Sequence, residues 1–127
     1  GEIPNEIGAY YPITLLAAVK PGMAAFDEEI FGPIFAVTKA RNVEDALSLA
    51  NQTEFGLGAA VFTNDLKKGE EIAKSKLHAG ACFVNDFVKS DPRLPFGGIK
   101  DSGYGRELSS YGLMEFVNIK TVVVKKA

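Results

Sequence analysis

The single cysteine is the strongest nucleophile that this sequence offers. Cys82 lies in an apolar stretch, residues 80–84 (GACFV), and His78 is the sole histidine. A reactive thiolate needs a polar or electropositive setting, whereas a free cysteine among apolar residues usually packs as a small hydrophobe. We therefore expect Cys82 to be structural and not catalytic. One Cys and one His cannot form a zinc ligand set, so no metal site is predicted.

Two adjacent carboxylates are the next candidates for chemistry. Glu28 and Glu29 precede residues 30–33 (IFGP). A carboxylate in such a position can act as a general acid or base. The same two residues can also form the solvated end of a short helix. Residue types alone favour the solvated helix end.

The glycine-rich stretches invite comparison with phosphate-binding loops. Residues 98–105 have the glycine spacing of a P-loop, but Tyr104 and Gly105 stand where Lys and Ser/Thr are required. Residues 103–108 (GYGREL) lack the third glycine of a dinucleotide fingerprint, and residues 56–58 precede a predicted strand instead of following one. We predict that these glycines serve turns or close backbone approaches.

Strands and helices alternate in the apolar pattern, which is the signature of a parallel sheet covered by helices. The clearest helix has Asn42 as its N-cap and apolar residues at the helical spacing that follows. Gly80 is expected to end the next helix, and Gly112 to weaken the last one. The predicted elements are an extended segment over 9–19, a helical turn over 23–29, a strand over 34–39, the helix from Asn42 to before Gly56, a strand over 59–63, a helix capped by Asn64 or Asp65 and reaching about residue 77, a strand over 81–85, a long loop over 86–103, a helix over 107–116 and a final strand over 117–125.

Composition limits the class of protein. The chain has 127 residues, of which 46% are hydrophobic and 24% charged, enough for one globular domain with a core. A net charge of −2 gives no basic footprint for nucleic acid. The sequence shows no membrane-spanning run and no signal peptide, so a cytoplasmic protein is expected. A start at Gly1 without an initiator Met suggests a cleaved tag or a cut inside a longer protein.

Several blocks in one order resemble the aldehyde dehydrogenase family. They are residues 28–33 (EEIFGP), 55–63 (FGLGAAVFT), 83–85 (FVN) and 95–107 (PFGGIKDSGYGRE). The resemblance covers essentially the whole chain. It implies an α/β fold for 1–127, the C-terminal portion of the catalytic domain, with a mostly parallel sheet, covering helices and a C-terminal assembly strand over about 117–125. It also implies a homo-oligomer.

The resemblance assigns roles to four residues. Glu29 corresponds to the glutamate that binds the nicotinamide ribose hydroxyls, and Phe31 to the phenylalanine that packs near the nicotinamide ring. Phe96 and Ser90 correspond to positions in the aldehyde tunnel. The resemblance implies NAD or NADP as the cofactor. The choice between the two stays open, because the part of the family that contacts the distinguishing 2′ position is not in this sequence. The other implied ligand is a small aldehyde.

Within the family, residues 88–96 (VKSDPRLPF) and 105–112 (GRELSSYG) look most like bacterial succinate-semialdehyde dehydrogenases. A serine in the tunnel suits an aldehyde that ends in a carboxylate, because a hydroxyl can donate to that group. Lys89 or Arg93 can add positive charge, although two exposed loop residues are an equally good interpretation.

The resemblance also places the family's catalytic cysteine outside this chain, since Cys82 aligns with an apolar strand position. The parent protein is then expected to oxidise its aldehyde to the acid through a cysteine thiohemiacetal. The 127 residues alone are expected to be inactive, with no catalytic residue among them. The alternative is a non-catalytic assembly module that never turns over substrate.

Overall fold

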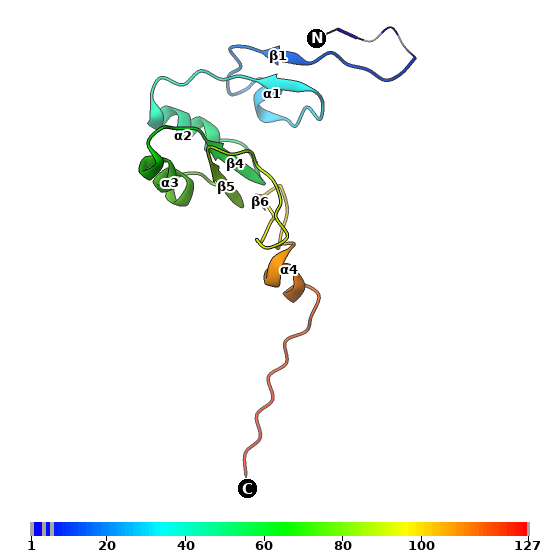
Figure 1. Ribbon diagram of the computed structural model, residues 1–127, viewed down its shortest axis with the longest axis vertical. Coiled ribbons are helices and arrows are strands. Elements are labelled where there is room, and N and C mark those ends of the chain that lie inside the picture. Colours follow the sequence, from blue (N-terminus) through cyan, green and yellow to red (C-terminus); the bar gives the residue numbers. More distant parts are fainter. Residues whose placement is uncertain (1, 4, 6, 127) are drawn as a thin grey trace. The chain divides into compact units, whose positions relative to one another are not determined.

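The computed structural model describes residues 2–3, 5 and 7–126. The chain divides into two compact units, Gly1–Glu54 and Phe55–Ala127. Figure 1 shows the elements of each unit along the chain. Each unit contains a pair of parallel strands with helices around it, so the predicted α/β class is confirmed.

The first unit is built on a parallel strand pair. Strand β1 (Thr14–Leu16) pairs with β2 (Ile34–Ala36), and helix α1 (Ala24–Asp27) lies in the crossover between them. Parallel strands need such a crossover, because a tight turn can join only antiparallel neighbours. Two further bonds extend the contact, from Val37 N–H to the Leu16 carbonyl at 2.9 Å and from Val19 N–H to the Val37 carbonyl at 3.1 Å.

Helix α2 (Val43–Asn51) begins as the sequence predicts. The Asn42 side chain accepts a hydrogen bond from the Asp45 N–H at 2.8 Å. Arg41 donates to both oxygens of the Asp45 carboxylate, at 2.7 and 3.0 Å, and these bonds hold the pKa of Asp45 at about 2. The Asn42 side chain satisfies one of the amide groups that a helix leaves unpaired at its start, and Asp45 fixes Arg41 before the cap.

The second unit repeats the same design. Strand β4 (Gly58–Val61) pairs in parallel with β5 (Ala81–Val84), and helix α3 (Leu66–Ser75) crosses between them (Figure 1). Asp65 is the N-cap of α3 and accepts from the Lys68 N–H at 3.1 Å. The helix packs on both strands through its buried residues Gly69 and Ile72.

The sequence did not predict the short antiparallel pair of the second unit. Strand β3 (Phe55–Gly56) pairs with β6 (Ile99–Lys100), and the Ser102 hydroxyl accepts from the Gly56 N–H at 2.9 Å. Both strands have only two residues, so they carry no period-2 signal that a sequence pattern can reveal. This pair ties the glycine-rich stretch to the start of β4.

Gly80 has a different role from the one predicted. Helix α3 ends at Ser75 with Lys76 as its C-cap, so Gly80 does not end the helix. Instead, a Cβ at Gly80 would overlap the carbonyl of Gly97. Gly112 is also more than a weak point in helix α4 (Ser109–Met114), because it is buried and a Cβ there would lie 2.7 Å from the Glu107 carbonyl carbon. Both glycines permit close backbone approaches.

The final strand predicted over 117–125 does not form within the described part of this chain, and its pairing with another chain stays a prediction. Residues 118–126 belong to no strand or helix, and none of the described residues forms a ladder with them. A strand is held by hydrogen bonds to a neighbouring strand, so an apolar sequence alone does not form one. Ile119, Val122 and Val124 are 77, 72 and 88% exposed. Among the described residues, no helix is long and apolar enough to cross a bilayer.

The contact between Gly80 and Gly97 gives a first prediction. Gly80→Ala places a methyl group on a backbone carbonyl that has no side-chain freedom to move away. We expect a loss of about 2 kcal/mol in the free energy of unfolding, measured by urea denaturation. Gly32→Ala is the matched control, because the nearest atom to a Cβ there is 4.0 Å away. Equal stability of the two variants would contradict the packing described here.

Candidate functional site

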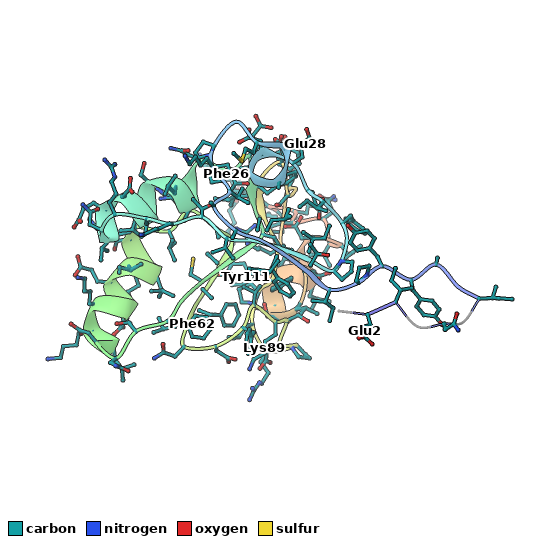
Figure 2. All side chains as sticks on the ribbon, turned by 90° about the horizontal axis from the view of Figure 1, so that it is seen from above. Glu2, Phe26, Glu28, Phe62, Lys89 and Tyr111 are labelled. Atoms are coloured by element: carbon teal, nitrogen blue, oxygen red, sulfur yellow. The ribbon has the colours of Figure 1, made fainter. Side chains whose placement is uncertain are left out.

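One candidate site lies in the first unit, in the loop between α1 and β2. Helix α1 ends where the Glu28 N–H donates to the Ala24 carbonyl at 2.8 Å, and Figure 2 shows Glu28 beside this helical turn. Glu29 follows it and is exposed. Its carboxylate has no hydrogen bond or ion pair with any of the described residues. It is therefore available to accept hydrogen bonds from a ligand.

Phe31 has an unusual backbone conformation in the same loop. Its φ is 53°, in the left-handed region, and its side chain is 91% exposed. A phenylalanine in this region costs about 1–3 kcal/mol, and such residues cluster at ligand sites. An exposed aromatic ring also offers a flat apolar face for another ring. An exposed carboxylate and an exposed aromatic ring thus lie two residues apart in one loop.

A separate candidate site is a pocket of about 450 Å³ in the second unit. Strand β5 forms one wall and the loop before Phe96 forms another. Phe96 is half-buried and fixed by two backbone bonds with Glu107, at 2.9 and 2.7 Å. The pocket is lined by Gly80, Ala81, Cys82, Phe83, Asp86, Lys89, Asp91, Leu94, Pro95 and Phe96.

Charged pairs stand around this pocket. Lys89 bonds to Asp86 at 2.6 Å, which lowers the pKa of that carboxyl. Arg93 makes two side-chain bonds to Asp91, at 2.9 and 2.6 Å, which lowers the pKa of Asp91. Lys89 lines the pocket and Arg93 does not. Because exposed pairs are worth at most about 1 kcal/mol, the Lys89 ammonium can turn toward a ligand.

Ser90 lies beside this pocket without lining it. The serine is exposed and stands between Lys89 and Asp91, both of which do line the pocket. Two of the four predicted site residues lie in the second unit. Phe96 forms part of the pocket wall, and Ser90 lies in the same loop beside the pocket. Glu29 and Phe31 lie together in the first unit. Sequence reasoning missed Asp86 and Asp91, whose only signal was an acidic residue close to a basic one.

Cys82 lies in the wall of the pocket, as part of strand β5. Its sulfur lies 3.9 Å from the Ala79 carbonyl, to which the thiol donates. Partial burial raises the pKa of the Cys82 thiol, so the neutral form dominates near neutral pH. No group of three metal-ligating side chains occurs among the described residues.

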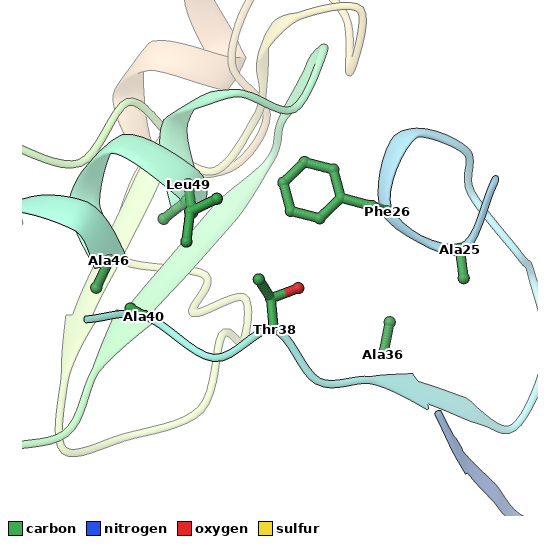
Figure 3. A pocket seen from close by; sticks show the side chains of 8 residues that line it. Ala25, Phe26, Ala36, Thr38, Ala40, Ala46 and Leu49 are labelled. Atoms are coloured by element: carbon green, nitrogen blue, oxygen red, sulfur yellow. The ribbon is translucent and has the colours of Figure 1, made fainter. Parts of the chain in front are cut away.

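The first unit contains an apolar cavity of about 320 Å³ (Figure 3). Phe26 and Leu49 face it, and small side chains complete its lining. Thr38 is the one polar residue in that lining, and none is charged. Without charged groups or several hydrogen-bonding side chains, this cavity does not resemble a catalytic site.

Comparison with known proteins decides the family. The sequence profile described as "Aldehyde dehydrogenase family" matches residues 1–122. The chain belongs to the aldehyde dehydrogenase family. It is 50% identical over 122 residues to an aldehyde dehydrogenase of Paenarthrobacter nicotinovorans, covering 96% of this chain and 26% of that protein. It is 52% identical, with the same coverage, to a succinate semialdehyde dehydrogenase [NAD(P)+] of Escherichia coli K12.

Solved structures of aldehyde dehydrogenases agree with this fold. An NAD-dependent aldehyde dehydrogenase of Sinorhizobium meliloti superposes with a TM-score of 0.80 at 41% identity, covering 84% of this chain and 21% of that one. A Mycobacterium tuberculosis aldehyde dehydrogenase complexed with NAD+ gives 0.76 at 38% identity, covering 80% and 21%. This aldehyde dehydrogenase chain thus spans about a quarter of the length of the curated relatives it matches.

The thiol of Cys82 gives a second prediction. Because burial raises its pKa, alkylation by iodoacetamide at pH 7.5 should be slower than that of free cysteine. The rate should keep rising with pH beyond the range in which an ordinary thiol levels off. Denaturing the chain in guanidinium should remove the difference. A native thiol that reacts faster than free cysteine would show an activated nucleophile.

Proposed function

We propose that this chain is the C-terminal part of an aldehyde dehydrogenase catalytic domain, in a protein that oxidises succinate semialdehyde to succinate with NAD or NADP. The observation that carries the substrate is the 52% identity to the Escherichia coli enzyme of that name. A relative in Synechocystis, named a probable succinate-semialdehyde dehydrogenase [NADP(+)], is 46% identical over the same length. We also propose a cytoplasmic location.

For the cofactor, we propose that Glu29 and Phe31 hold the nicotinamide ribose unit. NAD or NADP supplies the acceptor for the hydride that leaves the aldehyde carbon. The exposed Glu29 carboxylate accepts hydrogen bonds from two ribose hydroxyls, which fixes the position of the sugar. Phe31 packs its ring near the nicotinamide ring and excludes water from it. Both residues orient the cofactor and neither takes part in bond making.

For the aldehyde, we propose that Phe96 and Ser90 contact the substrate and that Lys89 adds positive charge. Phe96 gives the pocket an apolar wall for the two methylene groups between the carbonyl and the carboxylate. The Ser90 hydroxyl donates to the carboxylate end. Lys89 supports this end because it is the cation in the pocket lining. Arg93 is held by Asp91 through two bonds and serves the loop instead.

The nucleophile of this reaction is proposed to lie outside the 127 residues. Cys82 is the single cysteine of the sequence, and its raised pKa and place in a strand oppose thiolate chemistry. We infer that the isolated chain does not oxidise aldehydes. This inference leaves the binding groups of Glu29, Phe31, Ser90 and Phe96 with no catalytic group beside them.

A second candidate function is assembly. Residues 116–124 expose several large apolar side chains, among them Phe116 at 89% and Val123 at 81%. Surface of this kind usually contacts another chain. We propose that the residues 117–125 form a strand only against a partner strand, within a homo-oligomer. An assembly role is compatible with the enzyme role in a full protein. Aldehyde oxidation by the full protein tests the enzyme role, since the isolated chain is expected to be inactive under both proposals.

The substrate proposal gives a third prediction. In the full protein, kcat/KM for succinate semialdehyde should exceed that for butanal by about a hundredfold, because only the former presents a carboxylate to Ser90 and Lys89. Ser90→Ala should reduce this ratio by about tenfold, the value of roughly one hydrogen bond to a charged group. Purified 127-residue chain is the negative control, and turnover by it would overturn the placement of the nucleophile. Equal use of both aldehydes would reject the substrate.

The cofactor proposal gives a fourth prediction. In the full protein, Glu29→Gln should raise KM for the nicotinamide cofactor by about tenfold, because a neutral amide accepts more weakly than a carboxylate. Glu28→Gln is the matched control and should change it less than about twofold. Cofactor KM values from initial rates at saturating aldehyde distinguish the two variants. A larger effect of Glu28→Gln on the cofactor KM would show that Glu28, and not Glu29, makes the ribose contact.

A further inference from the structure

The aldehyde pocket depends on how the chain leaves strand β5. Asn85 follows the last residue of β5, and its N–H still donates to the Val61 carbonyl at 2.9 Å. Its φ is 56°, in the left-handed region, so the backbone turns away from the ladder at this residue. Asparagine is among the few side chains that tolerate this conformation. The loop over 86–96 starts here.

The side chain of Asn85 then replaces the lost backbone pairing. Its Oδ1 accepts from the Thr63 N–H at 2.7 Å, and its Nδ2 donates to the Thr63 carbonyl at 2.8 Å. A primary amide carries the same donor and acceptor as a peptide group. The Asn85 side chain thereby continues the parallel ladder of β4 and β5 by one step, although the backbone has already left it.

Two apolar contacts hold the next residues of the loop, one on β4 and one on Phe62 just after it. The rings of Phe62 and Phe87 lie 6.0 Å apart between centroids and are tilted by 59° (Figure 2 labels Phe62). Val88 packs so closely on Gly58 that a Cβ at Gly58 would lie 3.0 Å from its Cγ2 and closer to its Cγ1. Asn85 and the first residues of the loop are thus held at three points by β4 and the two residues that follow it.

The same loop supplies much of the pocket wall. After Asn85, the lining includes Asp86, Lys89, Asp91 and Phe96, with Leu94 and Pro95 between the last two. None of these residues is in a named strand or helix, although Phe96 at the far end of the stretch forms an antiparallel bridge with Glu107. The conformation of Asn85 sets the direction in which this stretch departs. Its two bonds to Thr63 fix the position of the starting point.

We propose that Asn85 is a positioning residue for the aldehyde pocket, and that its amide clamp on Thr63 sets which aldehydes the pocket accepts. This rests on the proposed function, because it takes the pocket to be the aldehyde site. Asn85 touches neither substrate nor cofactor in this role. Loss of the clamp lets the loop shift, which changes the fit of the aldehyde. Glu29 and Phe31 lie in a different loop, so their contacts with the cofactor stay unchanged.

The test uses the full protein with Asn85→Gly and Asn85→Asp. Glycine keeps the left-handed backbone and removes the clamp. Aspartate keeps one acceptor for the Thr63 N–H and cannot donate to the Thr63 carbonyl. Asn64→Gly is the matched control, since Asn64 is exposed, adjacent to Thr63 and outside the clamp. Initial rates with succinate semialdehyde, butanal and acetaldehyde give KM for each aldehyde and for the cofactor.

A positioning role predicts that both Asn85 variants raise KM for succinate semialdehyde by about tenfold, which corresponds to roughly one hydrogen bond. KM for the cofactor should stay within about twofold, and the preference for succinate semialdehyde over acetaldehyde should shrink. A purely structural role would instead reduce the amount of active enzyme and leave these ratios unchanged. That result would overturn the inference.

Limited trypsin digestion provides a second readout that needs no activity. Cleavage after Lys89 and Arg93, which lie within the loop, should accelerate in Asn85→Gly relative to cleavage after Lys74 in α3. Unchanged cleavage of the loop would reject the clamp even if KM changes. Wild-type protein without activity on any aldehyde would reject the proposed function, and faster loop cleavage in that case would still support the clamp. The two failures are therefore distinguishable.

Discussion

The parallel ladder between β4 and β5 is the interaction on which the second unit depends, because almost everything else in that unit is attached to one of its two strands. Helix α3 packs on the ladder through Gly69 and Ile72. The spacing is tight, since a Cβ at Gly69 would lie 2.8 Å from a Thr63 methyl and 2.9 Å from a Val84 methyl. The pocket uses β5 as a wall, and its loop begins where the ladder ends. A change in the ladder is therefore a change in the pocket.

The ladder is not surrounded by a large core. Among the described residues, Val19 and Ile72 are the buried apolar side chains, and many large apolar residues are exposed. Burying apolar surface is the main favourable term in folding, so both units leave much of this stabilisation unused. The exposed apolar residues are consistent with a chain that covers about a quarter of its curated relatives' length. Contacts with further protein would supply the missing burial.

Electrostatics divide the polar groups of the chain into structural and available ones. Asp45, Asp86 and Asp91 each bond to a nearby Arg or Lys, which lowers the pKa of all three carboxyls. Glu29 has no such partner among the described residues. The distinction favours Glu29 as a ligand-binding carboxylate, because a group without an internal partner breaks no internal bond when it binds. Lys89 and Arg93 are both ion-paired, and Arg93 is the poorer candidate for contact with substrate because it does not line the pocket.

The sequence by itself determined the family, the α/β class and the strand–helix–strand order, because these depend on local patterns and on motifs whose residues are close together. Asn42 was recognisable as an N-cap for the same reason, Asp65 was one of two candidates for the next cap, and the expectation that Cys82 is structural followed from its apolar neighbours. Tertiary structure decided what depends on distant residues. Only the fold shows that Gly80 meets Gly97, that β3 pairs with β6, and that residues 118–126 find no strand partner among the described residues. It likewise revealed the Asn85 clamp on Thr63, since hydrogen bonds across 22 residues leave no periodic signal in a sequence.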